Sequence, residues 1–260
     1  MRILVTGGAG FIGSNFVRLA LKKGHSTVVL DLLTYAGHEA TLDDLKGNSE
    51  FELLKGDVAD GKLVRELFSS RRPDAIVHFA AETHVDRSID DPSAFVRTNV
   101  LGTFELLEAA RCYWEKADQA VKDRFRFIHV STDEVYGALG TSGFFHEEDS
   151  YAPNSPYAAT KAGLIGMTRI VADQGAKFGI TANCIAPGLI RTDFARALWE
   201  NPAIEKKRSR ETPLQRIGEP DEIAGAAVFL AAPAGSFTTG QTFVIDGGTT
   251  AGSVVSTADD

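Results

Sequence analysis

A tyrosine and a lysine stand four residues apart in the stretch SPYAATKAGLIGMTR, which runs from Ser155 to Arg169. No helix breaker follows Pro156, so the stretch is predicted to form a helix that projects Tyr157 and Lys161 from one face. A phenol with an ordinary pKa of about 10 is a poor acid or base near neutrality, but a neighbouring ammonium favours the phenolate. The pair is therefore predicted to carry a proton.

A hydroxyl group is expected close to this pair. The segment STDEVYG, Ser131 to Gly137, follows an apolar run, so Thr132 is predicted to lie at the carboxyl edge of a parallel sheet, where ligands bind in open α/β folds. Its hydroxyl can hold a substrate oxygen there. A Tyr and a Lys at this spacing are by themselves usually a solvated helix face, but together with Thr132 and a glycine-rich turn they favour catalysis.

That glycine-rich turn is TGGAGFIG, Thr6 to Gly13, between the first predicted strand and the first predicted helix. Gly7, Gly10 and Gly13 let the backbone turn sharply and approach a pyrophosphate, whose charge is met by the N–H groups at the start of the helix. Asp31 ends the second predicted strand, where a carboxylate can accept the ribose hydroxyls and would repel a 2′-phosphate. The turn predicts a dinucleotide cofactor, with NAD preferred to NADP.

A second carboxylate follows the third predicted strand. Asp57, in GDVAD, is placed to meet the adenine amino group of such a cofactor. The alternative is that Asp57 caps the next helix, and the two roles are compatible.

The elements that must position these groups are short apolar runs alternating with longer amphipathic ones. This alternation predicts a single α/β domain over residues 1–260, a doubly wound Rossmann-type fold whose seven-stranded parallel sheet is flanked by helices. Helical patterns include residues 13–24 and 91–117. The predicted strands are Arg2–Thr6, Thr27–Leu30, Phe51–Leu54, Ala75–Phe79, Phe125–Val130, Ile180–Ile185 and Thr242–Ile245.

Composition narrows the class of partner. The chain has 260 residues and a formal net charge of −8, which disfavours a nucleic-acid or anionic-membrane partner because both need a basic face. Cys112 and Cys184 form no metal or redox spacing and the six histidines are scattered, so we expect reduced core thiols and no metal. Because the first residues lead directly into a glycine-rich turn and no apolar run is long enough to span a bilayer, we expect no signal peptide and no membrane-spanning segment. We expect a cytoplasmic protein with a small-molecule substrate.

These motifs resemble two branches of the short-chain dehydrogenase/reductase superfamily. Residues 1 to about 162 resemble the dTDP-glucose 4,6-dehydratases of the extended branch, on TGGAGFIGSNFVR, LDLLTYAG, GDVAD, HFAAETHVDRSI, TNVLGTFELLEAARCYW and FRFIHVSTDEVYG. From there on the chain resembles the compact single-domain dehydrogenases, on KAGLIGMTR, GITANCIAPGLIRTD, TPLQRIGEPDEIAGAAVFLAAP and GQTFVIDGG. The abrupt change of branch indicates a recombined or engineered chimera. Because the motif YAATKAG is common to both branches, the junction is expected within it, near residues 158–163.

The resemblance implies a role for each catalytic residue. Tyr157 would carry the proton of hydride transfer, and Lys161 would bind the nicotinamide ribose and lower the pKa of the tyrosine. Thr132 would orient the reacting oxygen, and Asn99 would support a proton-relay water through its helix.

The two branches imply further roles. In the dehydratases, Asp133 would protonate the departing sugar hydroxyl and Glu134 would take the proton from the neighbouring carbon. In the compact branch, the segment after the sixth strand would form the nicotinamide pocket, with the Ile190 backbone offered to the carboxamide. The cofactor contacts implied around it are Pro187, Gly188, Ile190 and Thr192, and those implied elsewhere are Phe11, Ile12, Val58 and Ala80.

Three functions stay open at this point. The first is an NAD-dependent oxidoreductase acting on a small alcohol or ketone, favoured by the complete Thr, Tyr, Lys and Asn set. The second is a dTDP-glucose 4,6-dehydratase, a lyase, favoured by the Thr-Asp-Glu triplet and opposed by the expected absence of the second lobe that grips a nucleotide diphosphate. The third is a chimeric scaffold that binds the cofactor without turnover.

Two expectations concern surfaces. The predicted helix 92–112 carries more apolar residues than one sheet-facing stripe needs, and the equivalent helix pairs with a partner subunit in both branches, so we expect a homo-oligomer, a dimer or a tetramer. The alternative is that all of these side chains are core. The tail 249–260 is expected to be loose. The apolar residues of the helix are Phe95, Val96, Val100, Phe104, Leu106 and Leu107.

Overall fold

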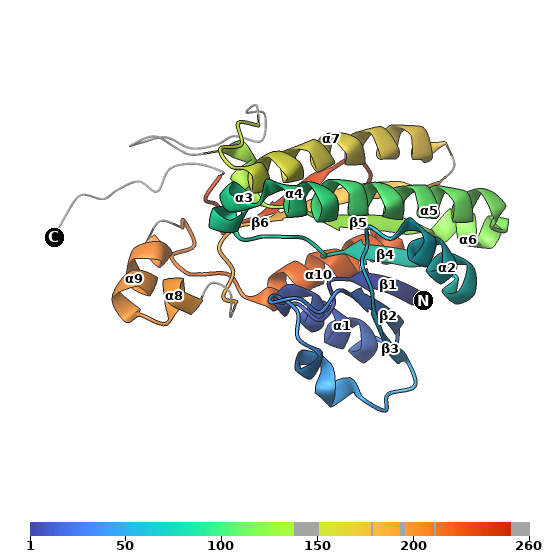
Figure 1. Cartoon of the computed structure of the whole chain (residues 1–260), viewed down its shortest axis with the longest axis horizontal. Coiled ribbons are helices and arrows are strands. Elements are labelled where there is room, and N and C mark those ends of the chain that lie inside the picture. Colours follow the sequence, from blue (N-terminus) through green and yellow to red (C-terminus); the bar gives the residue numbers. More distant parts are fainter. Residues whose placement is uncertain (138–150, 178, 193–195, 211, 251–260) are drawn as a thin grey trace.

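A computed structural model describes residues 1–137, 151–177, 179–192, 196–210 and 212–250 (Figure 1). Within these ranges, the strands before and after the predicted junction pair in parallel in one seven-stranded sheet of order β3-β2-β1-β4-β5-β6-β7. This sheet confirms the predicted fold class. The strands are β1 Arg2–Thr6, β2 Ser26–Asp31, β3 Phe51–Lys55, β4 Ala75–His78, β5 Arg126–Val130, β6 Thr181–Pro187 and β7 Thr242–Ile245.

Helices cover both faces of this sheet (Figure 1). Alternate strand residues face opposite sides, so Val5 and Ile128 join a core with α1 and α10, whereas Leu4 and Phe127 join a core with α2 and α5. Among the described residues, no helix is long and apolar enough to cross a bilayer. The helices are α1 Phe11–Lys22, α2 Gly61–Arg71, α3 Val85–Asp90, α4 Pro92–Phe95, α5 Thr103–Lys116, α6 Gln119–Arg124, α7 Pro156–Ala176, α8 Arg196–Trp199, α9 Pro202–Arg210 and α10 Pro220–Ala231.

The predicted junction lies within the described residues, whereas most of the predicted tail does not. Residues 158–163 fall inside α7, which continues without a break to Ala176. From residue 251 onward the predicted loose tail lies outside the described residues. The single domain and the chimeric origin stay predictions.

The predicted helix over residues 92–112 is present, but its middle is π-helical rather than α-helical. A π-helical segment, Val96–Gly102, separates α4 from α5. This wider turn carries Asn99 inward, where its side chain is fully buried and exchanges two hydrogen bonds with the backbone of Glu82, at 2.9 and 3.1 Å. Such π-helical turns often mark functional sites, because they re-aim a side chain without ending the helix.

The same helices leave apolar side chains on the surface. Phe95 and Leu106 are buried, but Val96 is 52% exposed and Phe104 is 47% exposed, so the alternative that the whole apolar surface is core is wrong. Leu101 adds a neighbouring side chain that is 40% exposed. These residues form a surface that a second copy of the chain could cover.

We therefore predict a homo-oligomer through this surface. Sedimentation at micromolar concentration is expected to give a particle larger than one chain, because covering Val96, Leu101 and Phe104 removes apolar area from water. The change Phe104→Ser is expected to shift the distribution toward monomer, whereas Phe237→Ser, on the C-terminal side of α10, serves as a matched exposed control. Sedimentation of the unaltered protein as a monomer would contradict the prediction.

The two cysteines are free thiols in different surroundings. Cys184, on β6, is fully buried as expected of a core thiol, whereas Cys112, on α5, is only half-buried. In the described part of the chain, no group of three or more His, Cys, Asp or Glu side chains is arranged to hold a metal ion.

Candidate active site

The parallel sheet gathers the predicted site residues at one edge, because the carboxyl ends of all its strands point the same way. The strand order reverses at β1, between β2 and β4, and ligands of doubly wound folds bind at such a switch point. Six of the seven strands supply one predicted contact at or just after their ends: the glycine turn after β1, Asp31 on β2, Asp57 after β3, Ala80 after β4, Thr132 after β5 and Pro187 on β6.

The glycine turn packs its backbone against the end of β4. Gly7 has φ +70°, and a Cβ there would lie 2.5 Å from the backbone nitrogen of Ala80, while a Cβ on Gly13 would overlap the carbonyl oxygen of Gly7. Only glycine allows this approach. The turn leads into α1, whose N-cap Gly10 makes no side-chain cap bond and whose first turn contains no acid. The N–H groups at this helix start are therefore suited to bind an anion from outside the chain.

Phe11 and Ile12 occupy the first turn of α1, and both are half-buried. Ala80, which the glycine turn touches, is also half-buried, whereas Val58 is almost fully buried against Gly102. These positions surround the turn, and their contacts with a cofactor stay predictions.

Asp31 is fixed beside the glycine turn. Its carboxylate accepts the N–H of Ala9 at 2.9 Å and the N–H of Leu33 at 2.8 Å, and the residue is only 7% exposed. Gly37 packs so closely that a Cβ there would lie 2.8 Å from the carboxylate. A negative group held in this way disfavours a second negative charge, such as a 2′-phosphate, in its immediate neighbourhood.

We predict that Asp31 sets the preference for NAD over NADP. Replacing Asp31→Asn, which keeps an oxygen acceptor and removes the charge, is expected to narrow the ratio of NADH to NADPH affinity by about tenfold. Fluorescence titration with both dinucleotides measures the ratio, and Asp31→Ala, which also releases Ala9 and Leu33, shows how much the hydrogen bonds matter. Tighter binding of NADPH by the unaltered protein would contradict the assignment.

Asp57 is held by an arginine that the sequence did not point to. Its carboxylate pairs with the guanidinium of Arg97, from the π-helical segment, at 2.9 Å. The alternative role of Asp57 as a helix cap is wrong, because Asp60 caps α2 and accepts two backbone N–H groups of its first turn. The contact of Asp57 with adenine stays a prediction.

The start of α7 presents Tyr157 and Lys161 as buried groups. Ser155 caps the helix by accepting the N–H of Ala158 at 3.0 Å. Tyr157 is 6% exposed and packs edge-on against Phe95, with ring centroids 6.3 Å apart. Lys161 is 2% exposed, and burial lowers its pKa to about 8. The alternative of a solvated helix face is therefore wrong for this pair.

Two contacts fix α7 over the sheet. The ammonium of Lys161 donates to the carbonyl oxygen of Val130, at the end of β5, at 2.9 Å. The amide nitrogen of Asn99 donates to the hydroxyl of Thr160 at 3.0 Å, and that hydroxyl donates to the carbonyl oxygen of Tyr157 at 2.7 Å. Asn99 thus connects α7 with the segment before α3, while its predicted proton-relay role stays a prediction. Sequence reasoning missed Thr160, although its hydroxyl stands three residues after Tyr157.

The acidic triplet forms a short turn beside α7. Thr132 caps a 3-10 turn, Asp133–Tyr136, and its hydroxyl accepts the N–H of Glu134 at 3.3 Å. The side chain of Glu134 reaches solvent, but the protein atoms around its carboxyl group desolvate it partly and raise its pKa. The side chain of Asp133 lies outside the described part of the structure.

The segment after β6 is fixed by backbone pairing. Gly188 donates its N–H to Ile245 at 3.0 Å, and a bridge between Ile190 and Gly218 uses the backbone groups of Leu189, Arg191 and Gly218. The N–H of Ile190 itself is not used in this bridge, and its role toward a carboxamide stays a prediction. The carbonyl oxygen of Thr192 accepts the indole N–H of Trp199 at 2.7 Å.

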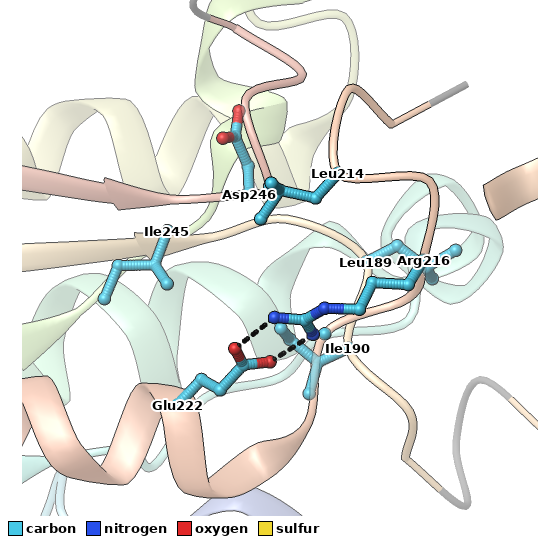
Figure 2. A pocket seen from close by; sticks show the side chains of 9 residues that line it. Leu189, Ile190, Leu214, Arg216, Glu222, Ile245 and Asp246 are labelled. Carbon is cyan, nitrogen blue, oxygen red and sulfur yellow. Dashed lines mark hydrogen bonds and ion pairs between the residues drawn. The ribbon is translucent and has the colours of Figure 1, made fainter. Parts of the chain in front are cut away.

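Leu189 and Ile190 of this segment line a cavity of about 80 Å³, whose lining side chains are drawn in Figure 2. Figure 2 shows Leu189 and Ile190 beside it, and the guanidinium of Arg216 lying along the carboxylate of Glu222, with two hydrogen bonds of 2.7 and 2.6 Å. Hydrogen bonding to Arg216 lowers the pKa of Glu222 to about 2. Neither Tyr157 nor Lys161 lines this cavity, so the cavity is not part of the site predicted for proton transfer.

Comparison with known proteins assigns relatives to the first part of the chain. A family model described as GDP-mannose 4,6 dehydratase matches residues 4–186. The dTDP-glucose 4,6-dehydratase of Xanthomonas campestris pv. campestris (strain B100) is 53% identical over 181 residues, which are 70% of this chain and 52% of that protein. The dTDP-glucose 4,6-dehydratase of Neisseria gonorrhoeae is 47% identical over 184 residues, 70% of this chain and 53% of that protein. The chain spans about half the length of these curated relatives.

Solved structures resemble nearly the whole chain. An oxidoreductase of the short-chain dehydrogenase/reductase family from Burkholderia thailandensis matches with a TM-score of 0.78 and 27% identity, covering 96% of this chain and 93% of that one. The dTDP-glucose 4,6-dehydratase DesIV from Streptomyces venezuelae, with NAD and TYD bound, matches with a TM-score of 0.73 and 34% identity, covering 95% and 76%. The structural likeness thus extends beyond residue 186, where the family match ends.

Proposed function

Because the chain belongs to the GDP-mannose 4,6 dehydratase family, within the short-chain dehydrogenase/reductase superfamily, we propose that it is an NAD-dependent enzyme that dehydrates a nucleotide-linked hexose. The observation that carries the proposal is the 3-10 turn after β5. This turn contains Glu134, is capped by Thr132 and packs against α7, the helix that bears Tyr157 and Lys161. A hydroxyl, a carboxylate, a phenol and an ammonium thus come from neighbouring elements at the end of β5.

The backbone and charges at the β1 end suit the cofactor. The pyrophosphate would lie at the N-terminus of α1, where the glycine turn leaves room and no acidic side chain competes. The ribose hydroxyls would lie at Asp31, which already holds the turn by accepting the N–H of Ala9. When bound, NAD accepts a hydride from the substrate carbon and returns it at the end of the reaction.

The side chains of this chain would move the protons. Tyr157, as phenolate, would take the proton of the hydroxyl that becomes a ketone, Lys161 would stabilise that phenolate, and Thr132 would orient the oxygen. Glu134 would then remove the proton from the carbon next to the ketone, and Asp133 would protonate the departing hydroxyl, so that one water molecule leaves. The returned hydride and the proton held by Glu134 would then add across the carbon–carbon double bond. Tyr157 would release its proton to solvent and Asp133 would take one up, so that the sugar loses only water.

Incubation with dTDP-glucose and NAD tests this function. The expected product has lost the mass of one water molecule and carries a ketone, with no net change in NADH absorbance, because the hydride is returned. Reactions without added NAD and with glucose in place of the sugar nucleotide serve as controls. A protein that binds NADH but leaves dTDP-glucose unchanged would overturn the proposal and support the scaffold hypothesis.

A second candidate is an oxidoreductase that acts on a small alcohol or ketone. It is supported by the extent of the two matches. The match to the B. thailandensis oxidoreductase covers 93% of that protein chain, whereas the match to the X. campestris dehydratase covers 52% of that protein. A panel of alcohols with NAD would then give net NADH absorbance at 340 nm with no loss of water, on the order of 1–10³ turnovers per second. The dehydration assay and the panel therefore separate the two candidates.

A further inference from the structure

A row of polar side chains crosses the centre of the sheet beneath Lys161. In the strand register, Thr6 on β1 pairs with His78 on β4, His78 pairs with His129 on β5, and His129 pairs with Cys184 on β6. Register partners share one face of a sheet. Every member is fully buried, and the proposed reaction uses none of them.

Most of this polar row is hydrogen-bonded. The imidazole of His78 contacts Thr6 Oγ1 at 2.6 Å and Thr103 Oγ1, on α5, at 2.8 Å. The thiol of Cys184 donates to Thr168 Oγ1, on α7, at 3.3 Å. The row therefore lies on the face that α5 and α7 cover, and its two flanks have conventional partners.

The centre of the row is different. Neither ring nitrogen of His129 has a hydrogen-bond partner among the described residues, and the same holds for the hydroxyl of Ser131, two positions along on the same side of the chain. Buried polar atoms are rarely left in this state, because they have lost their contact with water without replacement. The two ring nitrogens of His129 and the hydroxyl oxygen of Ser131 therefore indicate a bound group between them and their surroundings.

A charged group close to these atoms is Lys161. Its ammonium donates to the carbonyl oxygen of Val130, the residue between His129 and Ser131, and an ammonium has two further protons to donate. The groups that face His129 are His78 from β4, Cys184 from β6 and Lys161 from α7. Burial, and next the charge of Lys161, lowers the pKa of His129 well below its ordinary value, so the ring is neutral and has a nitrogen that can accept.

We propose that His129 and Ser131, together with the Val130 carbonyl, form an inner acceptor site for the Lys161 ammonium, which reaches the two side chains through an internal water molecule. His129 is then a positioning residue, because it acts on the reaction only through the lysine. The link to catalysis rests on the proposed function of Lys161, whereas the acceptor site itself does not. The site keeps a buried lysine protonated next to Tyr157.

Competitive labelling of the cofactor-free protein with acetic anhydride, read by mass spectrometry over a range of pH, measures the proton affinity of Lys161. In His129→Phe, which fills the space without an acceptor, this affinity is expected to fall by about tenfold. In His129→Gln, which keeps an acceptor, it is expected to stay close to that of the unaltered protein. Ser131→Ala is also expected to lower the proton affinity of Lys161. This variant tests the proposal if His129→Phe does not fold.

The labelling experiment has two results that overturn the proposal. One is an unchanged Lys161 proton affinity in both His129→Phe and Ser131→Ala. The other is an equal loss in the phenylalanine and glutamine variants, which indicates altered packing rather than a lost acceptor. Because no cofactor or sugar is present, failure here is distinct from failure of the dehydratase assay.

Discussion

Replacing Tyr157→Phe is expected to abolish most of the activity of the chain while leaving its NADH affinity nearly unchanged. The phenylalanine ring can still pack edge-on against Phe95, so the change removes the phenolic hydroxyl with its transferable proton and keeps the ring. A positioned acid or base contributes a factor of roughly 10² or more, far beyond the effect of a surface substitution. Turnover of dTDP-glucose measures the first quantity, and fluorescence titration with NADH measures the second.

The lysine provides the matched comparison. Lys161→Ala is expected to harm both turnover and NADH binding, because the ammonium is assigned to the ribose as well as to the phenolate, and because its loss removes the bond to the Val130 carbonyl. If Tyr157→Phe keeps full activity, the phenol carries no proton and the catalytic assignment fails.

Replacing Glu134→Gln is expected to slow the loss of water by roughly 10²–10⁴-fold, because an amide cannot take the proton from carbon. The oxidation that depends on Tyr157 is expected to survive, so NADH should accumulate with the sugar nucleotide instead of being consumed again. Mass spectrometry of the sugar and absorbance of NADH separate the two steps. Glu66→Gln, at an exposed position of α2, is a matched control and is expected to have no effect.

The pH dependence of the same step follows from the surroundings of Glu134. Partial desolvation raises the pKa of this carboxyl group above that of an ordinary glutamate. The base acts only when it is ionised, so water loss is expected to decline as the pH falls through this raised pKa, at a higher pH than an ordinary glutamate would require. Wild-type rates of water loss in Glu134→Gln would show that another group is the base.

Sequence patterns were sufficient for the sheet and for the placement of the main motifs. Seven apolar runs became the seven strands with boundaries shifted by a few residues, because a strand buried on both faces needs a continuous apolar segment. The glycine turn and Asp31 were located because each must occupy a strand end to meet a dinucleotide. Both depend on residue type and local position, which a sequence displays.

Contacts between distant segments could not be predicted in this way. The π-helical turn is set by the bonds of Asn99 to Glu82 and Thr160, which lie 17 and 61 residues away along the chain. The ion pair of Asp57 with Arg97 likewise joins residues that are 40 positions apart in the sequence. The central histidines looked scattered, because only the strand register shows that His78 and His129 are neighbours.

The packing of α10 against α1 has a consequence for the chain as it is made. Ile223, Ala224 and Ala227 complete the core beside Phe16 and Val17, yet they are synthesised about 200 residues later. Until Pro220–Ala231 has left the ribosome, this side of the nascent sheet is uncovered and apolar, which is the condition for capture by a holding chaperone. A ribosome-bound chain stalled before Pro220 should therefore be cut by protease within α1, where the released full-length chain is resistant.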